Sequence, residues 1–371
     1  MCELGGALRT TSSFAEAEPV LCAVREGARK SGEKRIELRA ELDLLHLALS
    51  TNPANRTQEL VERATAAIPL LEQQGDDRAL GRAWFYVANV RGPYHCRYVD
   101  AEAATRKAIL HYKRAGWPAS ACLSLLASAL TNGPTPVDDA LAACEELLAD
   151  ADQMGQASIV SLLALLKAMR GTFEEARALV GLAREIYAQL GQSLTAEYTC
   201  GRTESQVELL AGDLDRAQAS LERSYSVLKQ HRERSHLATR AAMLADVLYR
   251  RECWKESEAY VSAAESYSVA DDVVTEWLWR SAKARLQARA GRHESAQQLV
   301  EAAVSILADT DALNYQAACS LDFAEVHRLA GRSAQAATAV EEAIGLYELK
   351  GNIVAAARAR AFPRNSGELL V

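Results

Sequence analysis

Residues 171–183 decide the fold, and they read GTFEEARALVGLA. A glycine, an alanine five positions later, an apolar residue four further on and a small residue three beyond that recur at this spacing in the second half of the chain. The copies are GDLDRAQASLERS (212–224), GRHESAQQLVEAA (291–303) and GRSAQAATAVEEA (331–343). Self-similarity at a fixed period of 20–50 residues is typical of stacked-repeat proteins. The stretch therefore predicts a repeat array.

The period extends over nearly the whole chain. Small or apolar residues mark it about every forty positions, at Leu60, Ala101, Ala140, Ala176, Ala217, Ser257, Ala296 and Ala336. Each unit holds two amphipathic segments, and no stretch alternates with the period of two that indicates a strand. We therefore expect an all-α fold, a right-handed α-solenoid of about eight or nine helical hairpins.

Glycines separate the segments. Gly212 is suited to the left-handed conformation that ends a helix, and Asp213 or Asp215 is suited to cap the next one. A second set of glycines is expected to form the turns between hairpins: Gly75, Gly116, Gly155, Gly191 and Gly351. In the unit around Ser257, Arg251-Glu252 replaces the glycine, which predicts either a strained turn or a turn type that tolerates other residues.

The period also predicts domain limits. We expect the array over residues 14–362, a partial first helix with a loose N-terminus over 1–13, and a flexible tail over 363–371. Residues 131–136 contain Pro134 and Pro136, which exclude a continuous helix and predict a stiff elbow. The array begins inside a repeat, so the sequence predicts that the chain is part of something larger.

Composition excludes several classes of function. The net charge is −7, with acidic residues interleaved among the basic ones, whereas nucleic-acid binding needs a clustered basic face. No apolar run is long enough to cross a bilayer and no secretory leader is visible, so we expect a cytoplasmic protein without a membrane partner. The eight cysteines form no Cys-x-x-Cys pair and read as small buried side chains.

The motifs of catalysis are missing from the sequence. It contains no Gly-x-x-x-x-Gly-Lys-Ser/Thr loop for nucleotide phosphates and no Gly-x-Ser-x-Gly elbow. His231 and His236 are five residues apart, which places them on different helix faces, whereas a zinc pair needs four. We therefore predict no enzyme activity, no catalytic residue, no cofactor and no metal.

The repeated motif resembles the tetratricopeptide repeat. The longer period resembles the C-terminal helical region of bacterial signalling ATPases of the actinobacterial type, in which a cyclase or LuxR-type DNA-binding domain accompanies an AAA-type ATPase. The similar phrases are GPTPV (133–137), RGTFEEARALV (170–180) and LYELKGN (346–352). The resemblance implies an adenylate cyclase-associated sensing arm in signal transduction, which binds a protein or peptide and acts on an ATPase domain within the same chain or in trans.

The resemblance also implies a groove, lined by the first helix of each hairpin. Eight positions are carried over as inward-facing: Arg202, Gln206, Asp246, Arg250, Arg285, Arg289, Glu325 and Arg328. Their arginines suit carboxylates or phosphates, which favours an acidic peptide; the alternative is solvated helix faces with local ion pairs. Trp277 and Trp279 are either hydrophobic anchors in this groove or bridges between hairpins.

Two functions remain open from the sequence. The first is a non-catalytic scaffold that binds another protein. The second is a small-ligand sensor, which predicts an enclosed pocket between hairpins lined by tryptophan and arginine. If Arg285 and Arg289 line an open groove, reversing their charge should abolish partner capture and leave the helix content unchanged.

Overall fold

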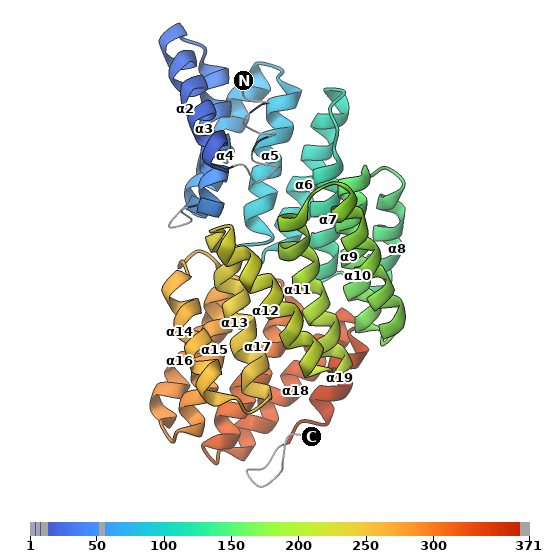
Figure 1. Cartoon of the computed structure of the whole chain (residues 1–371), viewed down its shortest axis with the longest axis vertical. Helices are drawn as coiled ribbons and strands as arrows, with labels where there is room; N and C mark the ends of the chain where they lie inside the picture. The colour runs from blue at the N-terminus through green and yellow to red at the C-terminus, as the bar shows by residue number, and fades with distance from the viewer. Residues whose placement is uncertain (1–3, 5–7, 9–13, 52–55, 364–371) are drawn as a thin grey trace.

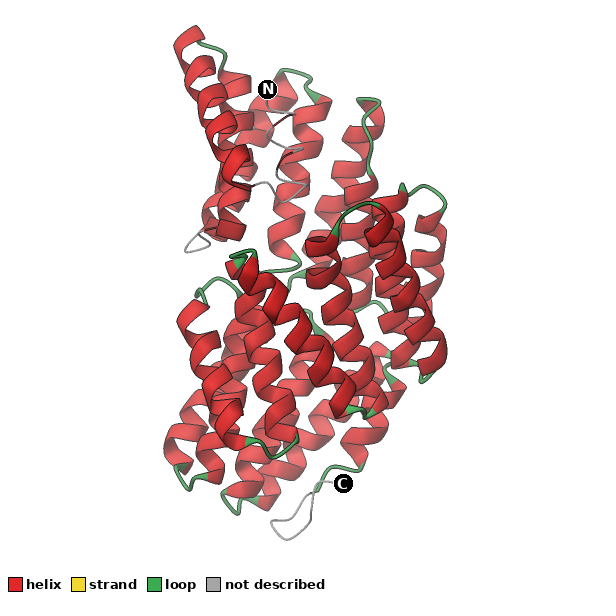
Figure 2. Ribbon diagram, in the orientation of Figure 1, coloured by secondary structure: helices red, strands yellow, loops and turns green. Residues whose placement is uncertain are grey.

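A computed structural model of the chain describes Leu4, Leu8, residues 14–51 and residues 56–363, and all regular structure in these ranges is helical (Figure 2). There, eight hairpins follow α2 (Phe14–Ser31) and precede α19 (Ile353–Arg360). Their first helices are α3 (Lys34–Thr51), α5 (Asp77–Arg91), α7 (Ser120–Asn132), α9 (Gln153–Met169), α11 (Ser193–Ala211), α13 (Arg234–Arg250), α15 (Val273–Arg289) and α17 (Leu313–Leu329). Their second helices are α4 (Arg56–Gln73), α6 (Tyr98–Arg114), α8 (Val137–Leu148), α10 (Phe173–Gln189), α12 (Leu214–Gln230), α14 (Trp254–Tyr267), α16 (His293–Ala308) and α18 (Ser333–Lys350).

The residues that mark the period form the contact between the two helices of each hairpin. All eight have 0% exposure, and each lies in the second helix of its unit. Ala176, for example, packs with Ala164 and Ala168 of α9 and with Val207 of α11. Small side chains at these positions let neighbouring helices approach closely, and the next hairpin covers what one hairpin leaves exposed. The predicted fold class, a right-handed α-solenoid of tandem hairpins, is confirmed.

The turn within the hairpin α11–α12 has the predicted form. Gly212 has φ 86°, in the left-handed region, and the Asp213 carboxylate accepts a hydrogen bond of 3.0 Å from the backbone N–H of Arg216. The prediction that Gly155 forms a turn is wrong. Gly155 lies in the first turn of α9, where its N–H donates to the Asp152 carboxylate that caps the helix.

The hairpin α13–α14 has no glycine in its turn, and it adopts the same left-handed backbone conformation at a higher conformational free energy. Glu252 has φ 61°, so a residue with a Cβ occupies the left-handed region that Gly171, Gly212, Gly291 and Gly331 occupy in other hairpins; Cys96 and Arg232 are in the same region. The strained turn is therefore the alternative that the structure supports.

Replacing Glu252 with glycine is expected to raise the free energy of unfolding by about 1 kcal/mol. The left-handed conformation costs an L-residue roughly 1–2 kcal/mol, and the entropy that glycine loses on folding offsets part of this gain. Thermal unfolding followed by circular dichroism measures the change. The matched control, Glu258→Gly at an exposed interior position of α14, is expected to lose about 1 kcal/mol. Equal losses in both variants would contradict strain at Glu252.

The solenoid coils far enough that late hairpins contact early ones (Figure 1). Helix α13 contacts α3, and α19 contacts α9. Between the same regions, the Thr57 hydroxyl and N–H donate to the Asp271 carboxylate, and the N–H of Val273 donates to the carbonyl of Tyr94 at 2.9 Å. These contacts bring the first helices of seven hairpins around one concave space.

The loop at 131–136 separates two helices, since α7 ends at Asn132 and α8 begins at Val137. The fully buried Lys350, at the end of α18, donates hydrogen bonds to three carbonyls around this loop. The elbow and the domain limits stay predictions. The expected N-terminal stub and tail lie outside the described residues, except for Leu4, Leu8 and residue 363.

Candidate functional site

A cavity of about 460 Å³ lies in the concave surface and is partly open to solvent. Its walls come from the first helices α3, α5, α7, α9, α11 and α13, from the loop after α5, and from the starts of α6 and α15. Concave surfaces of solenoids are their usual binding surfaces, and ligand pockets measure about 300–1,000 Å³. The cavity is therefore the strongest candidate for a binding site in the described part of the chain.

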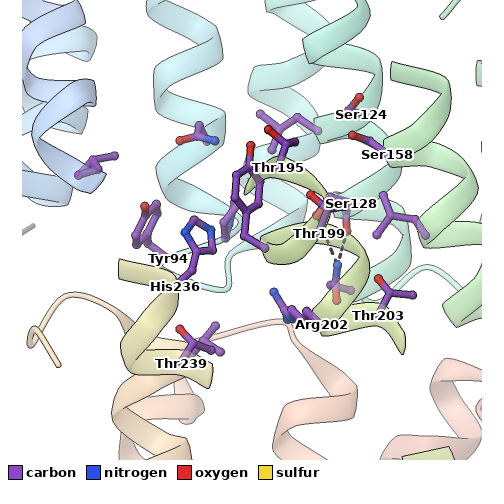
Figure 3. A pocket seen from close by; sticks show the side chains of 18 of the residues that line it. Tyr94, Ser124, Ser128, Ser158, Thr195, Thr199, Arg202, Thr203, His236 and Thr239 are labelled. Atoms are coloured by element: carbon purple, nitrogen blue, oxygen red, sulfur yellow. Dashed lines mark hydrogen bonds between the residues drawn. The ribbon is translucent and has the colours of Figure 1, made fainter. Parts of the chain in front are cut away.

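Hydroxyl and amide side chains cover two walls of the cavity. On α7 they are Ser124, Ser128 and Asn132, and on α11 they are Thr195, Thr199 and Thr203 (Figure 3). Residues four apart share one helix face, so each set forms a stripe along its helix while the opposite face packs into the core. The Asn132 amide donates to the Ser128 carbonyl at 2.9 Å, which holds it in place. Thr195 and Thr203 are buried and have partners in Gln192 and Ser161. The half-buried members of the stripes, Ser124, Ser128, Asn132 and Thr199, offer hydrogen bonds to an elongated ligand.

Aromatic rings form another part of the wall. Phe85, Tyr94 and Tyr198 line the cavity, and the His236 ring stacks on Tyr198 with ring centroids 4.8 Å apart. Phe85 and its neighbour Trp84 also pack against the core, and the other neighbour, Tyr86, lies within it with 0% exposure. Consecutive helical residues turn by about 100°, so one residue of this aromatic group faces the concave space. The rings add apolar contact area to a lining that is otherwise polar.

Four charged side chains line the same space: Arg202, Glu233, Arg240 and Asp272. Glu233 and Asp272 precede α13 and α15, where their carboxylates accept backbone N–H groups and cap these helices. Burial raises the pKa of Asp272 to about 6, although hydrogen bonds from Thr275 oppose the shift. Both carboxylates therefore have structural partners at the rim of the cavity.

The positions carried over as a groove fall into two groups. Arg202 and Gln206 line the cavity. The others form ion pairs beyond it, where buried Arg285 reaches Asp246 at 2.6 Å and Asp322 at 3.2 Å. This placement corrects the expectation that Arg285 lines an open groove. Helices α13 and α17 of the two neighbouring hairpins cover Arg285 and supply its partners.

A second ion-paired group follows on the last hairpins. Buried Arg328 donates to buried Glu325 at 2.7 and 2.9 Å, and Glu325 also accepts from the Tyr249 hydroxyl at 3.2 Å. Arg250 and Arg289 are exposed; Arg250 pairs with Asp246 at 2.9 Å, and Arg289 lies over the Trp254 ring at 4.1 Å. Local ion pairs are thus present in this region, but those of Arg285, Glu325 and Arg328 are buried and do not lie on solvated helix faces. Binding by any of the carried-over residues stays a prediction.

Trp277 and Trp279 are both buried, with 4% and 7% exposure. Trp277 packs with Tyr315 of α17, at 5.7 Å between ring centroids. Trp279 packs with Ala241 and Ala242 of α13. The two rings thus lie in different interfaces of α15, which fits bridges between hairpins better than exposed anchors.

No group of three His, Cys, Asp or Glu side chains that could hold a metal ion occurs within the described part of the chain. No helix in that part has both the length and the apolar character needed to cross a bilayer.

No protein-family model matches the chain, and no curated protein matches it in sequence. Among solved structures it is similar to a Rap protein complexed with Competence and Sporulation Factor, with a TM-score of 0.64 and 10% identity over 95% of this chain and 98% of that one. It is also similar to a signal transduction ATPase with numerous domains and a tetratricopeptide repeat sensor, from Pyrococcus horikoshii. There the TM-score is 0.50 and the identity 13%, over 88% of this chain and 54% of that one. At these identities the likeness shows the fold, a tetratricopeptide-like helical solenoid.

Sequence reasoning placed Arg202 and Gln206 in the groove and missed most of the cavity lining, including His236 and Arg240. The sequence does contain a signal for this lining. Hydroxyl or amide residues recur at intervals of four on first helices that are otherwise apolar, as in Ser124, Ser128 and Asn132. Such a stripe has no role in the core, so it marks the face that points into the concave space.

Proposed function

We propose that the chain is a non-catalytic protein-interaction module whose concave cavity binds an extended peptide segment of a partner. One observation carries the proposal: hydroxyl and amide stripes from several first helices converge on one partly open cavity. An extended peptide exposes backbone N–H and C=O groups along its length, and each needs a partner when it leaves water. Rows of Ser, Thr, Asn and Gln side chains supply both donors and acceptors.

The solved neighbours support the proposal at the level of architecture. A Rap protein of the same fold is solved in complex with Competence and Sporulation Factor. A signal transduction ATPase carries a similar solenoid as its tetratricopeptide repeat sensor. By extension, we propose that binding in the cavity is reported to an ATPase domain in the cytoplasm, joined to this chain or acting in trans.

A small-ligand sensor is the second candidate, because the volume of about 460 Å³ also suits a single small molecule. It is the less favoured one, since the lining extends over many helices and the cavity is open on one side. An elongated ligand uses such a lining more fully than a compact one.

The test is a selection with phage-displayed random dodecapeptides on the full chain and two variants. Ser124→Trp places a large ring in the cavity, whereas Ser262→Trp places it on the exposed face of α14. The two serines are matched, since each hydroxyl donates to the carbonyl four residues earlier, at 3.2 and 3.0 Å. Selected peptides are expected to bind Ser124→Trp at least about 10-fold more weakly than wild type, a difference of roughly 1.4 kcal/mol. They should bind Ser262→Trp normally.

Two results would overturn the peptide proposal. One is a selection that enriches no peptide. The other is peptides that bind Ser124→Trp as tightly as they bind the wild-type chain. In either case the small-ligand sensor becomes the better account of the cavity.

A further inference from the structure

The two arginines at the cavity differ from the buried arginines outside it. Arg240 has 0% exposure, and its guanidinium donates to the Ser224 hydroxyl at 3.1 Å and to the carbonyl of Tyr198 at 2.6 Å. Arg202 lines the cavity and donates to the Tyr315 hydroxyl. The described hydrogen bonds of both guanidiniums therefore go to uncharged groups. Arg285, by contrast, pairs directly with two carboxylates.

The carboxylates nearby are engaged elsewhere. Glu233 accepts the N–H of His236 at 2.8 Å and faces its ring nitrogen Nδ1 at 3.1 Å. Asp272 accepts the hydroxyl of Thr275 at 2.7 Å. Glu197, which also acts on Arg240 electrostatically, pairs with arginines of α10 and α12. Each of the three carboxylates thus has its own partner, and none forms a described ion pair with either guanidinium.

The positive charge of Arg240 is poorly compensated. Burial lowers the pKa of Arg240 to about 9, and the nearby charge of Arg202 lowers it further, against the opposing effect of Glu233 and Glu197. A buried charge without an opposite charge is costly, and proteins usually place such a charge where a partner or ligand neutralises it. Arg202 is half-buried and reaches the open cavity, so its guanidinium is available to a ligand.

We infer that the cavity holds a carboxylate of its peptide ligand on Arg202, with Arg240 behind it adding positive potential. The inference rests on the proposed peptide-binding function and names the chemistry of one subsite. The planar guanidinium fork matches a carboxylate with two parallel hydrogen bonds, and such bonds are strongest in a site that excludes water. Thr199, one turn before Arg202 on α11, lies within the same wall to complete the contact (Figure 3).

Two sources supply this carboxylate: the C-terminus of the peptide, or an aspartate or glutamate within it. Synthetic random dodecapeptide pools separate them. One pool has free C-termini and no acidic side chains, a second has amidated C-termini with acidic side chains, and a third has neither. The first or the second pool is expected to bind the wild-type chain at least about 10-fold better than the third. Equal binding of all three pools would overturn the inference.

Substitutions of Arg202 then test whether the carboxylate binds this residue. Arg202→Gln is expected to remove the preference for the carboxylate pools, and Arg202→Lys to reduce it at least about threefold, because lysine keeps the charge without the fork. The control is Arg106→Gln, an exposed residue of α6 in a surface pair with Glu102. An unchanged preference in Arg202→Gln would overturn the inference. If that variant does not fold, an unchanged preference in Arg202→Lys has the same meaning.

A separate thermal-unfolding experiment distinguishes failure of the carboxylate subsite from failure of the peptide proposal. Sodium glutarate, compared with sodium chloride at equal ionic strength, is expected to raise the Tm of the wild-type chain by about 2 °C and to leave Arg202→Gln unchanged. Peptides that are blocked by Ser124→Trp but indifferent to Arg202→Gln would leave the peptide function standing and reject the carboxylate subsite. A glutarate effect that depends on Arg202, without any selected peptide, would support the subsite and reject the peptide function. A Tm unaffected by glutarate in the wild-type chain would count against the subsite.

Discussion

The variant Arg285→Glu is expected to lose at least about 4 kcal/mol of unfolding free energy. Arg285 is buried between α13 and α17, where its guanidinium contacts the carboxylates of Asp246 and Asp322 and lies over the Tyr249 ring at 4.5 Å. The substitution removes this shared cation and adds a third carboxylate to a buried site. Thermal unfolding followed by circular dichroism measures the loss as a large fall in Tm.

The control for Arg285→Glu is Arg292→Glu, an exposed position in the turn before α16. Its unfolding free energy is expected to stay within about 0.5 kcal/mol of wild type. Similar Tm values for the two variants would mean that the buried ion pairs contribute little. The structure thereby replaces the sequence-based expectation that charge reversal at Arg285 leaves the helix content unchanged.

The variant Lys350→Met is expected to lose about 3 kcal/mol of unfolding free energy, the second largest effect. The Lys350 ammonium donates to the carbonyls of Leu130, Gly133 and Thr135, at 3.0, 2.8 and 2.5 Å. Methionine fills a similar volume but leaves three carbonyls without this donor, and each buried unsatisfied acceptor costs about 1–3 kcal/mol. The release of the lysine from burial offsets part of that cost.

Hydrogen exchange locates this effect. In Lys350→Met, the amides of α8 and of the C-terminal end of α7 are expected to exchange at least about 10-fold faster, because the loop between them has lost its attachment to α18. Lys255→Met, at an exposed position of α14, is the control and should leave both regions unchanged. Equal exchange rates in wild type and Lys350→Met would show that the contact does not hold the loop.

The fold was predictable because the residues that mark the forty-residue period are also the residues at which the helices pack. A small residue every forty positions marks the closest approach of two helices, and every such position proved fully buried. Gly155 was mistaken for a turn residue because the sequence alone does not distinguish a glycine just outside a helix from a glycine in its first turn. Its neighbour Asp152, a capping residue, distinguishes the two cases.

The site was predictable only in part, for a geometric reason. The resemblance to the tetratricopeptide repeat implies inward positions for single hairpins, and two of those positions, Arg202 and Gln206, line the cavity. How far the solenoid coils is the sum of many small rotations between hairpins, and no local pattern encodes it. Contacts such as Thr57 with Asp271 depend on that sum, whereas the two adjacent hairpins bury Arg285.

The most direct test of the account maps where a bound peptide lies. A peptide from the phage selection, carrying benzoylphenylalanine near its centre, is irradiated with the wild-type chain and the cross-linked positions are read by mass spectrometry. The account predicts cross-links on the first helices α7, α9, α11 and α13, and their loss in Ser124→Trp. Cross-links confined to the second helices α10, α12 and α14 would contradict the claim that the concave cavity is the binding site.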